Sequence, residues 1–285
     1  LHHIIVLILE PIITATSYPY SCGSFPKRGA HYGKKRLLKW IRDGTNIKYF
    51  GKIDIRHFYD NIRIDILMRE LAIRISDTWF LYVIRLCMAG FSKGIPLGFY
   101  VSQWLANYLL EPLDEFIRKL GFEKYMRYMD DMVFFGAVKK KIHTVIIQIR
   151  MFIGRRYRLK LKHNYQVCRF YYESKKRRAV GRPLDFMGFL FYRNKTIMRK
   201  SIMLEAVRTA KKLNTAKSAG RGFYVRHIKS MLSHMGWFSC TDTYDCYNIH
   251  IKPLVNITKL KKIISKLDRR NNNETVERGT LLNAA

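Results

Sequence analysis

The sequence has few acidic residues: 21 Asp and Glu stand against 53 Lys and Arg, which gives a formal net charge of +32. A compact chain with so large an excess of one sign repels itself unless polyanions share its surface. Such a balance is typical of nucleic-acid binding, and 18 Tyr and 17 Phe add rings on which bases can stack. A generically basic protein, or one bound to an anionic membrane, is the weaker alternative, and we predict no membrane partner.

Cysteine is scarce, and no two of the five residues form a CxxC pair: Cys22, Cys87, Cys168, Cys240 and Cys246. This scatter argues against a zinc site and against a disulfide framework, and it fits a reducing cytoplasm. The apolar opening HHIIVLILEPII lacks the cationic start and the cleavage site of a signal peptide, and it is too short to span a bilayer. We predict a buried helix over residues 1–16 and a cytoplasmic protein.

The most prominent acids are Asp130 and Asp131, in the stretch KYMRYMDDMVFFG. Apolar, strand-forming runs on both sides predict two strands joined by a tight turn, with the carboxylates at its tip. Burying two like charges is costly without a cation, and a divalent metal ion is the natural one because hard cations bind carboxylate oxygens. Taken alone, the pair fits a solvated hairpin turn at least as well.

A third acid, Asp54, lies near the end of an alternating segment, residues 49–55, that predicts a strand. An acid in that position is either a metal ligand or the cap of a following helix, and the segment alone leaves both open. Further on, SKGIPLGFYVSQ, residues 92–103, predicts a Gly-rich turn that leads into an apolar helix. The turn differs from a phosphate-binding P-loop because no Gly-Lys-Ser or Gly-Lys-Thr follows it.

Other segments predict a mixture of loops, strands and helices. Residues 17–33 are rich in Gly, Pro and Ser and predict a loop, whose Lys27 and Arg28 either grip a phosphate or are simply solvated. Alternation predicts a strand over residues 157–161. Residues 182–200 predict a hairpin with its turn at 193–195. The chain after residue 200 has a basic, helical pattern.

These stretches, taken in order, resemble the reverse transcriptases, and specifically those of bacterial retroelements, over nearly the whole chain. FGKIDIRHFYDNI resembles the block that holds the family's first metal-binding Asp, and GIPLGFYVSQ resembles the block that positions template and nucleotide. YMDD is the family's hallmark tetrad, and DFMGFLF resembles its primer-grip hairpin. One such block would be weak support, whereas four in family order are a specific match.

The resemblance implies an α+β fold of the right-hand polymerase type. Fingers and palm, with an antiparallel palm sheet, would occupy residues 1–198, a helical thumb residues 199–270, and a polar tail residues 271–285. The family's earliest fingers blocks do not appear, so we expect the N-terminal fingers to be truncated. No ribonuclease H domain, maturase extension or HNH-type nuclease motif is visible in these residues.

The resemblance also implies an RNA-directed DNA polymerase, a nucleotidyltransferase that makes cDNA by two-metal chemistry. Asp54, Asp130 and Asp131 would be the catalytic residues and would hold two Mg²⁺ ions, or Mn²⁺ instead, with Ile55 among the metal ligands. Tyr59 would be an aromatic steric gate against a ribose 2′-hydroxyl. The remaining implied contacts are to the nucleotide, from Leu97, Gly98, Gln103, Lys27 and Arg28, and to the primer, from Phe186, Met187 and Gly188.

Two departures from the family pattern matter. Leu97 stands where retroviral and group II intron enzymes often carry Gln, and this makes the chain look like the enzymes of diversity-generating retroelements, which copy RNA with errors at adenines. A site that loses a hydrogen-bonding amide discriminates less well. The block that usually carries a pyrophosphate-protonating Lys reads His163-Asn164-Tyr165-Gln166, with Lys160 and Lys162 out of register, so the general acid stays unassigned.

The implied partners are an RNA template, a DNA or RNA primer and deoxynucleoside triphosphates, with an accessory protein or a structured RNA as a further candidate. Within the family, we prefer the diversity-generating type, and an antiphage-defence reverse transcriptase is the alternative. A non-catalytic RNA-binding protein with a polymerase fold is the alternative from another class. It is disfavoured because binding alone does not need three clustered acids on so cationic a chain.

Overall fold

The computed structural model describes residues 1–91, 94–96, 98–174, 176 and 178–282, with side chains described as far as residue 269. The chain divides into two compact units, Leu1–Met187 and Gly188–Ala285. The sequence predicts a boundary between residues 198 and 199 instead. In the structure, the hairpin after Met187 belongs to the second unit. Which parts serve as fingers, palm and thumb stays a prediction.

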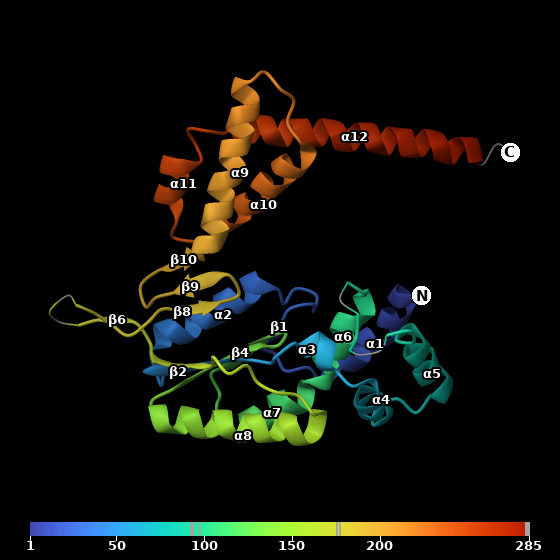
Figure 1. Cartoon of the computed structure of the whole chain (residues 1–285), viewed down its shortest axis with the longest axis vertical. Helices are drawn as coiled ribbons and strands as arrows, with labels where there is room; N and C mark the ends of the chain where they lie inside the picture. Colours follow the sequence, from blue (N-terminus) through green and yellow to red (C-terminus); the bar gives the residue numbers. More distant parts are fainter. Residues whose placement is uncertain (92–93, 97, 175, 177, 283–285) are drawn as a thin grey trace. The chain divides into compact units, whose positions relative to one another are not determined.

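The centre of the first unit is a five-stranded sheet with the order β1-β3-β4-β2-β5 (Figure 1). Its strands are β1 (Ser21–Cys22), β2 (Tyr49–Asp54), β3 (Tyr125–Tyr128), β4 (Asp131–Gly136) and β5 (Gln166–Arg169). All neighbours are antiparallel except β1 and β3, which are parallel. The predicted strand before Asp54 and the predicted hairpin around Asp130 and Asp131 are both confirmed, and they are neighbours in this sheet.

Helices cover both faces of the sheet. Figure 1 shows α7 and α8 along one face and α2 along the other, and α8 packs against β2, β4 and β5. The helices of this unit are α1 (His2–Thr16), α2 (Ala30–Asp43), α3 (Phe58–Asn61), α4 (Ile64–Ala72), α5 (Thr78–Cys87), α6 (Tyr100–Leu109), α7 (Glu111–Lys119) and α8 (Lys139–Tyr157).

The helix α6 lies in the core, as its apolar sequence predicts. Trp104, Leu105 and Leu109 are buried, and α1 packs against α6. The predicted N-terminal helix is therefore present, but only one face of it is buried, because Ile4 and Leu7 remain exposed. None of the helices in the described residues combines the length and the hydropathy that a bilayer span needs.

The predicted strand over residues 157–161 is wrong. The helix α8 continues to Tyr157 and ends at Arg158, which adopts the left-handed conformation with φ 58°. Of that segment only Leu161 pairs, in an isolated antiparallel bridge with Ile55. Residues 175–178, KKRR, lie in the sequence between β6 (Tyr172–Glu173) and β7 (Ala179–Val180), which pair antiparallel, and two of these four residues fall outside the described ones.

The second unit begins with the antiparallel pair β9 (Phe189–Phe191) and β10 (Thr196–Met198), so the predicted turn at 193–195 is confirmed. Its helices are α9 (Lys200–Ser218), α10 (Val225–Ser239), α11 (Tyr244–His250) and α12 (Ile257–Leu282). Apolar residues of α9 and α10, such as Leu213 and Met231, form a separate core. The helix α12 runs into the predicted polar tail and continues to Leu282.

Candidate active site

Strand register brings the three acids together. In the antiparallel pair of β2 and β4, Asp54 lies directly opposite Asp131. Strands β3 and β4 pair up to Tyr128 and Asp131, so Met129 and Asp130 form the two-residue connection between them. Met129 adopts the left-handed conformation, with φ 55°, which a tight turn of this kind requires. The predicted grouping of Asp54, Asp130 and Asp131 therefore occurs at one end of the sheet.

Each of the two facing carboxylates has one compensated and one unpaired oxygen. Asp54 Oδ2 lies 2.7 Å from Lys162 Nζ, and Asp131 Oδ2 lies 3.0 Å from Lys52 Nζ. The other oxygens, Oδ1 of Asp54 and Oδ1 of Asp131, are buried without a hydrogen-bond partner. Buried unpaired carboxylate oxygens are energetically costly, and a hard divalent cation is the ligand that they suit.

Repulsion among the carboxylates also indicates a site for a divalent cation. Burial, followed by the charge of Asp54, raises the pKa of Asp130 above its ordinary value. Burial raises the pKa of Asp131 to about 6, although the neighbouring Lys52 opposes the rise. In the described part of the chain, no three Asp, Glu, His or Cys side chains already converge as a metal cluster. The donor set nevertheless fits a cation, because two buried oxygens lack partners and the charges are only partly compensated.

The main chain next to Asp54 is held by residues that follow α8. Ile55 is buried and lies opposite Leu161, and the flanking hydrogen bonds run from the Lys162 N–H to the Asp54 carbonyl and from the Arg56 N–H to the Lys160 carbonyl, both at 2.8 Å. Neither bond uses the carbonyl of Ile55, the atom through which Ile55 could act as a metal ligand. This pairing also explains how Lys162 reaches Asp54.

Lys52 connects Asp131 to the predicted primer grip. Its Nζ donates to the Asp185 carbonyl oxygen at 2.8 Å and lies 5.8 Å from the centre of the Phe186 ring. Asp185 and Phe186 belong to β8 (Leu184–Phe186), and both Met187 and Gly188 after it have positive φ, 52° and 85°. The resemblance to a primer-grip hairpin thus corresponds to a tight turn after β8, while its role stays a prediction.

The predicted gate residue lies beside the carboxylates. Burial, followed by the charge of Asp130, raises the pKa of Tyr59 to about 12. The Tyr59 carbonyl accepts a hydrogen bond from the Ile95 N–H at 3.0 Å, and a Cβ at Gly94 would lie 2.5 Å from that carbonyl oxygen. Gly94 also has φ 77°, a conformation that residues with a side chain rarely adopt. Glycine at this position is therefore what allows the turn to pack against Tyr59.

The other predicted nucleotide contacts are spread around this turn. Leu97 lies outside the described residues, and Gly98 is exposed with φ 93°. Gln103 on α6 faces the same region, because Ser24 Oγ lies 2.9 Å from Gln103 Oε1 and 3.4 Å from Met129 Sδ. The loop before α2, the helix α6 and the Asp-Asp turn therefore meet.

The two predicted cations of the loop differ in their surroundings. Lys27 is exposed, with φ 60°. Arg28 donates from Nη1 to Ser17 Oγ at 2.8 Å and to the Tyr18 carbonyl at 3.5 Å, so it bonds to its own loop. A nucleotide contact from either residue stays a prediction.

Comparison with known proteins decides the family. The model of the family described as reverse transcriptase (RNA-dependent DNA polymerase) matches residues 1–190. The chain belongs to the reverse transcriptase family. Protein YkfC of Escherichia coli (strain K12) is 24% identical over 126 residues, which are 40% of this chain and 33% of YkfC.

Solved reverse transcriptases share the fold. The structure of apo telomerase from Candida tropicalis has a TM-score of 0.55 at 12% identity and covers 81% of this chain and 43% of the telomerase. Telomerase of the same species in complex with the TWJ fragment of telomeric RNA has a TM-score of 0.50 at 12% identity, with 82% and 44% covered. The chain thus spans less than half the length of these relatives. The likeness confirms the predicted α+β polymerase fold.

Two lysines of this reverse transcriptase were not assigned from the sequence. Lys162 seemed out of register with the family's lysine, yet its ammonium group reaches Asp54. Lys52 lies two residues before Asp54 on β2, and this spacing places both side chains on one face of the strand. The alternation of side chains along β2 could therefore have placed Lys52 near the acids. The position of Lys162, in contrast, depends on the long-range pairing of Ile55 with Leu161.

Proposed function

We propose that the protein is an RNA-directed DNA polymerase that adds deoxynucleotides to the 3′ end of a primer by two-metal nucleotidyl transfer. The observation that carries the proposal is the register of β2 and β4, which sets Asp54 opposite Asp131 with a buried, unpaired oxygen on each. Membership of the reverse transcriptase family supports it. A protein that only binds RNA has no need for clustered, mutually repelling carboxylates.

Asp54, Asp130 and Asp131 would hold two Mg²⁺ ions, or Mn²⁺, with the Ile55 carbonyl nearby. The bound ions would supply activation of the primer hydroxyl and charge stabilisation at the leaving pyrophosphate. Lys162 places a positive charge beside Asp54 and is the chain's own candidate for contact with that pyrophosphate. Lys52 compensates the charge of Asp131.

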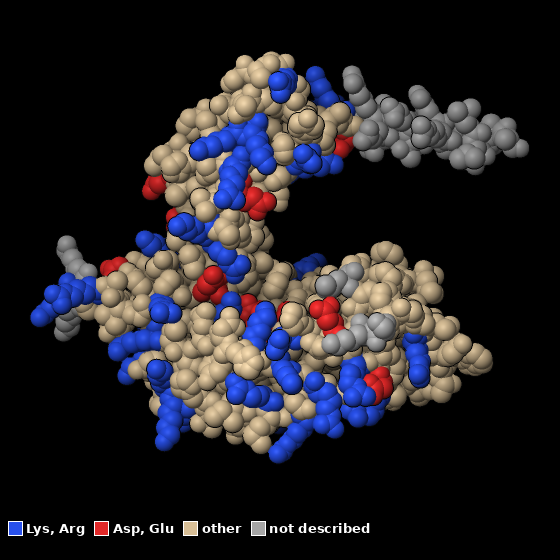
Figure 2. All heavy atoms as spheres, viewed as in Figure 1, with Lys and Arg blue, Asp and Glu red and all other residues tan. Residues whose placement is uncertain are grey.

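Tyr59 would contact the sugar of the incoming nucleotide. Gly98, Gln103, Lys27 and Arg28 would contact the remainder of the nucleotide and the template, and Phe186, Met187 and Gly188 would contact the primer. Figure 2 shows Lys and Arg side chains over the visible face of each unit, with far fewer Asp and Glu. This charge suits an RNA template and a DNA or RNA primer, and it leaves room for an accessory protein or a structured RNA.

The direct test is primer extension on an RNA template with deoxynucleoside triphosphates. We expect extension that requires Mg²⁺ or Mn²⁺ and that disappears in the double variant Asp130→Ala/Asp131→Ala. Asp65→Ala is the matched control, because Asp65 is exposed and its ion pair is with Arg63, away from the carboxylate cluster. Equal signals from the wild type and the double variant would exclude the catalytic proposal, and tight RNA binding without extension would favour the binding protein.

Within the family, we propose the diversity-generating type, on the basis of Leu97 and the Ser-Gln pair that follows it in the sequence. We expect cDNA errors to be several-fold more frequent opposite template adenine than opposite the other bases, and we expect Leu97→Gln to reduce that excess, because an amide restores a hydrogen-bonding group at the pocket. Sequencing the cDNA measures both effects. Uniform accuracy at all four bases would favour the antiphage-defence alternative, as would the absence of a neighbouring template and variable repeat pair.

A further inference from the structure

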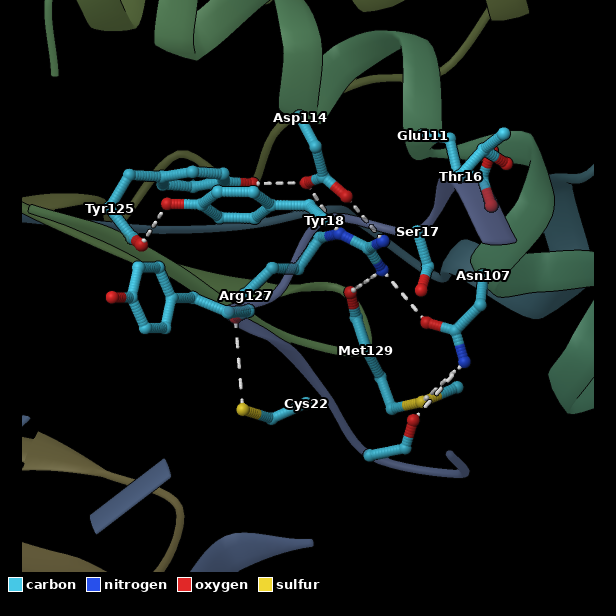
Figure 3. Close-up of polar contacts among 12 residues, drawn as sticks. Thr16, Ser17, Tyr18, Cys22, Asn107, Glu111, Asp114, Tyr125, Arg127 and Met129 are labelled. Atoms are coloured by element: carbon cyan, nitrogen blue, oxygen red, sulfur yellow. Dashed lines mark hydrogen bonds and ion pairs between the residues drawn. The ribbon is translucent and has the colours of Figure 1, made fainter. Parts of the chain in front are cut away.

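A fully buried cation lies in the strand that leads to the Asp-Asp turn. Arg127 on β3 has no exposed surface, and its guanidinium binds Asp114 of α7 through two bonds, Nε to Oδ1 at 2.8 Å and Nη2 to Oδ2 at 2.7 Å (Figure 3). Tyr125 also donates to Asp114 Oδ1, at 2.7 Å. Both oxygens of this buried carboxylate are therefore occupied, and the pair is fixed in one geometry.

The third nitrogen of Arg127 points away from Asp114 toward the turn. Nη1 donates to the Met129 carbonyl at 3.0 Å and to Asn107 Oδ1 at 2.9 Å (Figure 3). The N–H of Met129 donates to the Cys22 carbonyl at 3.1 Å. Both main-chain groups of Met129, the left-handed residue directly before Asp130, are thus held by defined partners.

The same network reaches the helix that carries Gln103. The Nδ2 group of Asn107 donates to the Gly23 carbonyl at 3.2 Å and to the Gln103 carbonyl at 3.1 Å. Asn107 lies one helical turn after Gln103 on α6, and it is almost fully buried. One guanidinium therefore connects α7, α6 and the turn that carries Asp130.

Stability alone does not account for this arrangement. A buried ion pair loses much of its Coulombic gain to desolvation, and apolar residues of similar volume often stabilise a core as well or better. What apolar residues cannot supply is a donor for the Met129 carbonyl. A lysine cannot supply it together with two bonds to Asp114, because its ammonium is a single point whereas the guanidinium is a planar fork.

We propose that Arg127 is a positioning residue: its guanidinium fixes the Met129 carbonyl, and thereby sets the place of Asp130 relative to α6. The proposal rests on the proposed function for the carboxylate site. Displacement of a reacting group by about 1 Å costs on the order of 10²-fold in rate. The effect of losing Arg127 therefore falls on the chemical step more than on the binding of template and primer.

The test compares Arg127→Lys with Arg74→Lys. Arg74 donates to the buried Glu111 at 2.7 Å and lies in the same unit, so its variant also weakens a largely buried ion pair, but one that does not touch the turn. We expect Arg127→Lys to lower kcat for primer extension by about 10- to 100-fold with KM for primed template changed less than about threefold. Arg74→Lys should leave both within about threefold.

Hydrogen exchange of the peptide spanning residues 125–136 gives a second readout, which is independent of activity. We expect the amides of residues 128–131 to exchange about tenfold faster or more in Arg127→Lys and at the wild-type rate in Arg74→Lys. Asn107→Ser keeps the Asp114 pair but removes one bond to the guanidinium together with the two bonds from Asn107 Nδ2 to the Gly23 and Gln103 carbonyls, so it should show the same changes at smaller size. Asn107→Ser provides the test of the positioning role if Arg127→Lys does not fold.

The outcomes separate the two proposals. Wild-type exchange at residues 128–131 in Arg127→Lys and Asn107→Ser overturns the positioning role, and so does a loss of melting temperature with kcat unchanged. If the wild type extends no primer, the proposed function fails, yet the exchange measurement still decides whether Arg127 holds the turn.

Discussion

Asp130→Asn is expected to reduce primer extension by about 10³-fold or more and, in the absence of metal, to raise the melting temperature. The loss of activity follows because an amide cannot replace a carboxylate as a ligand of a divalent ion, and a catalytic metal contributes several kcal/mol to stabilisation of the transition state. The substitution keeps the shape of the side chain, so the turn itself should persist. Steady-state primer extension on RNA measures this part of the prediction.

The rise in melting temperature follows from the charge of Asp130. Burial and Asp54 raise the pKa of its carboxyl. The folded state therefore holds this proton more tightly than the unfolded state, and stability is lost as the pH rises through the raised pKa. Asparagine does not ionise, so the Asp130→Asn variant does not lose stability in this way as the pH rises. We therefore expect a higher melting temperature for Asp130→Asn at pH 8 without metal, and a difference that shrinks as the pH falls through the raised pKa.

Asp65→Asn is the control for both measurements. Asp65 is exposed, and its hydrogen bond with Arg63 lowers its pKa. Neutralising it should leave extension unchanged and should lower the melting temperature slightly or not at all, which is the opposite sign. Thermal denaturation with and without Mg²⁺ checks the assignment, because the ion should stabilise the wild type more than Asp130→Asn. Extension within tenfold of the wild type in Asp130→Asn would contradict a metal-binding role.

The hairpin around Asp130 can be predicted from the sequence alone, whereas the contact between Lys162 and Asp54 cannot. The apolar, strand-forming runs on both sides of Asp130 and Asp131 predict the hairpin correctly, because the pattern is local and its turn is short. Whether Asp54 meets the pair depends on the register of β2 and β4, which nothing within either strand specifies. The resemblance to reverse transcriptases supplied that grouping before the structure did.

The sequence leaves Lys162 unassigned for a related reason. The alternation at residues 157–161 suggests a strand, but α8 continues to Tyr157 because its apolar face packs on the sheet, and Arg158 then reverses the chain. Only the bridge from Leu161 to Ile55 brings Lys162 beside Asp54. Arg127 had a local signal, since it is a single cation inside an otherwise apolar and aromatic strand, but its partners on α6 and α7 come from tertiary packing.

Tyr59→Ala is expected to admit ribonucleotides, with the ratio of ribonucleotide to deoxyribonucleotide incorporation raised by about 10- to 200-fold, the range in which apolar pockets discriminate by size. The backbone that carries the ring is held in place by its neighbours. The preceding Phe58 is buried, Ile95 bonds to the Tyr59 carbonyl, and Gly94 packs against it, so the side chain starts from a fixed backbone. Single-nucleotide extension with each sugar measures the ratio.

Tyr59→Phe is the matched variant, and it separates the ring from the hydroxyl. The pKa of Tyr59 is raised to about 12, so the hydroxyl stays neutral at working pH and carries no charge that the metal site could use. We therefore expect Tyr59→Phe to keep the wild-type sugar preference, while Tyr59→Ala loses it with deoxynucleotide extension still measurable. Unchanged preference in Tyr59→Ala would remove the gate from this residue. Loss of preference in Tyr59→Phe as well would instead assign the discrimination to the hydroxyl, since only that group differs between Tyr and Phe.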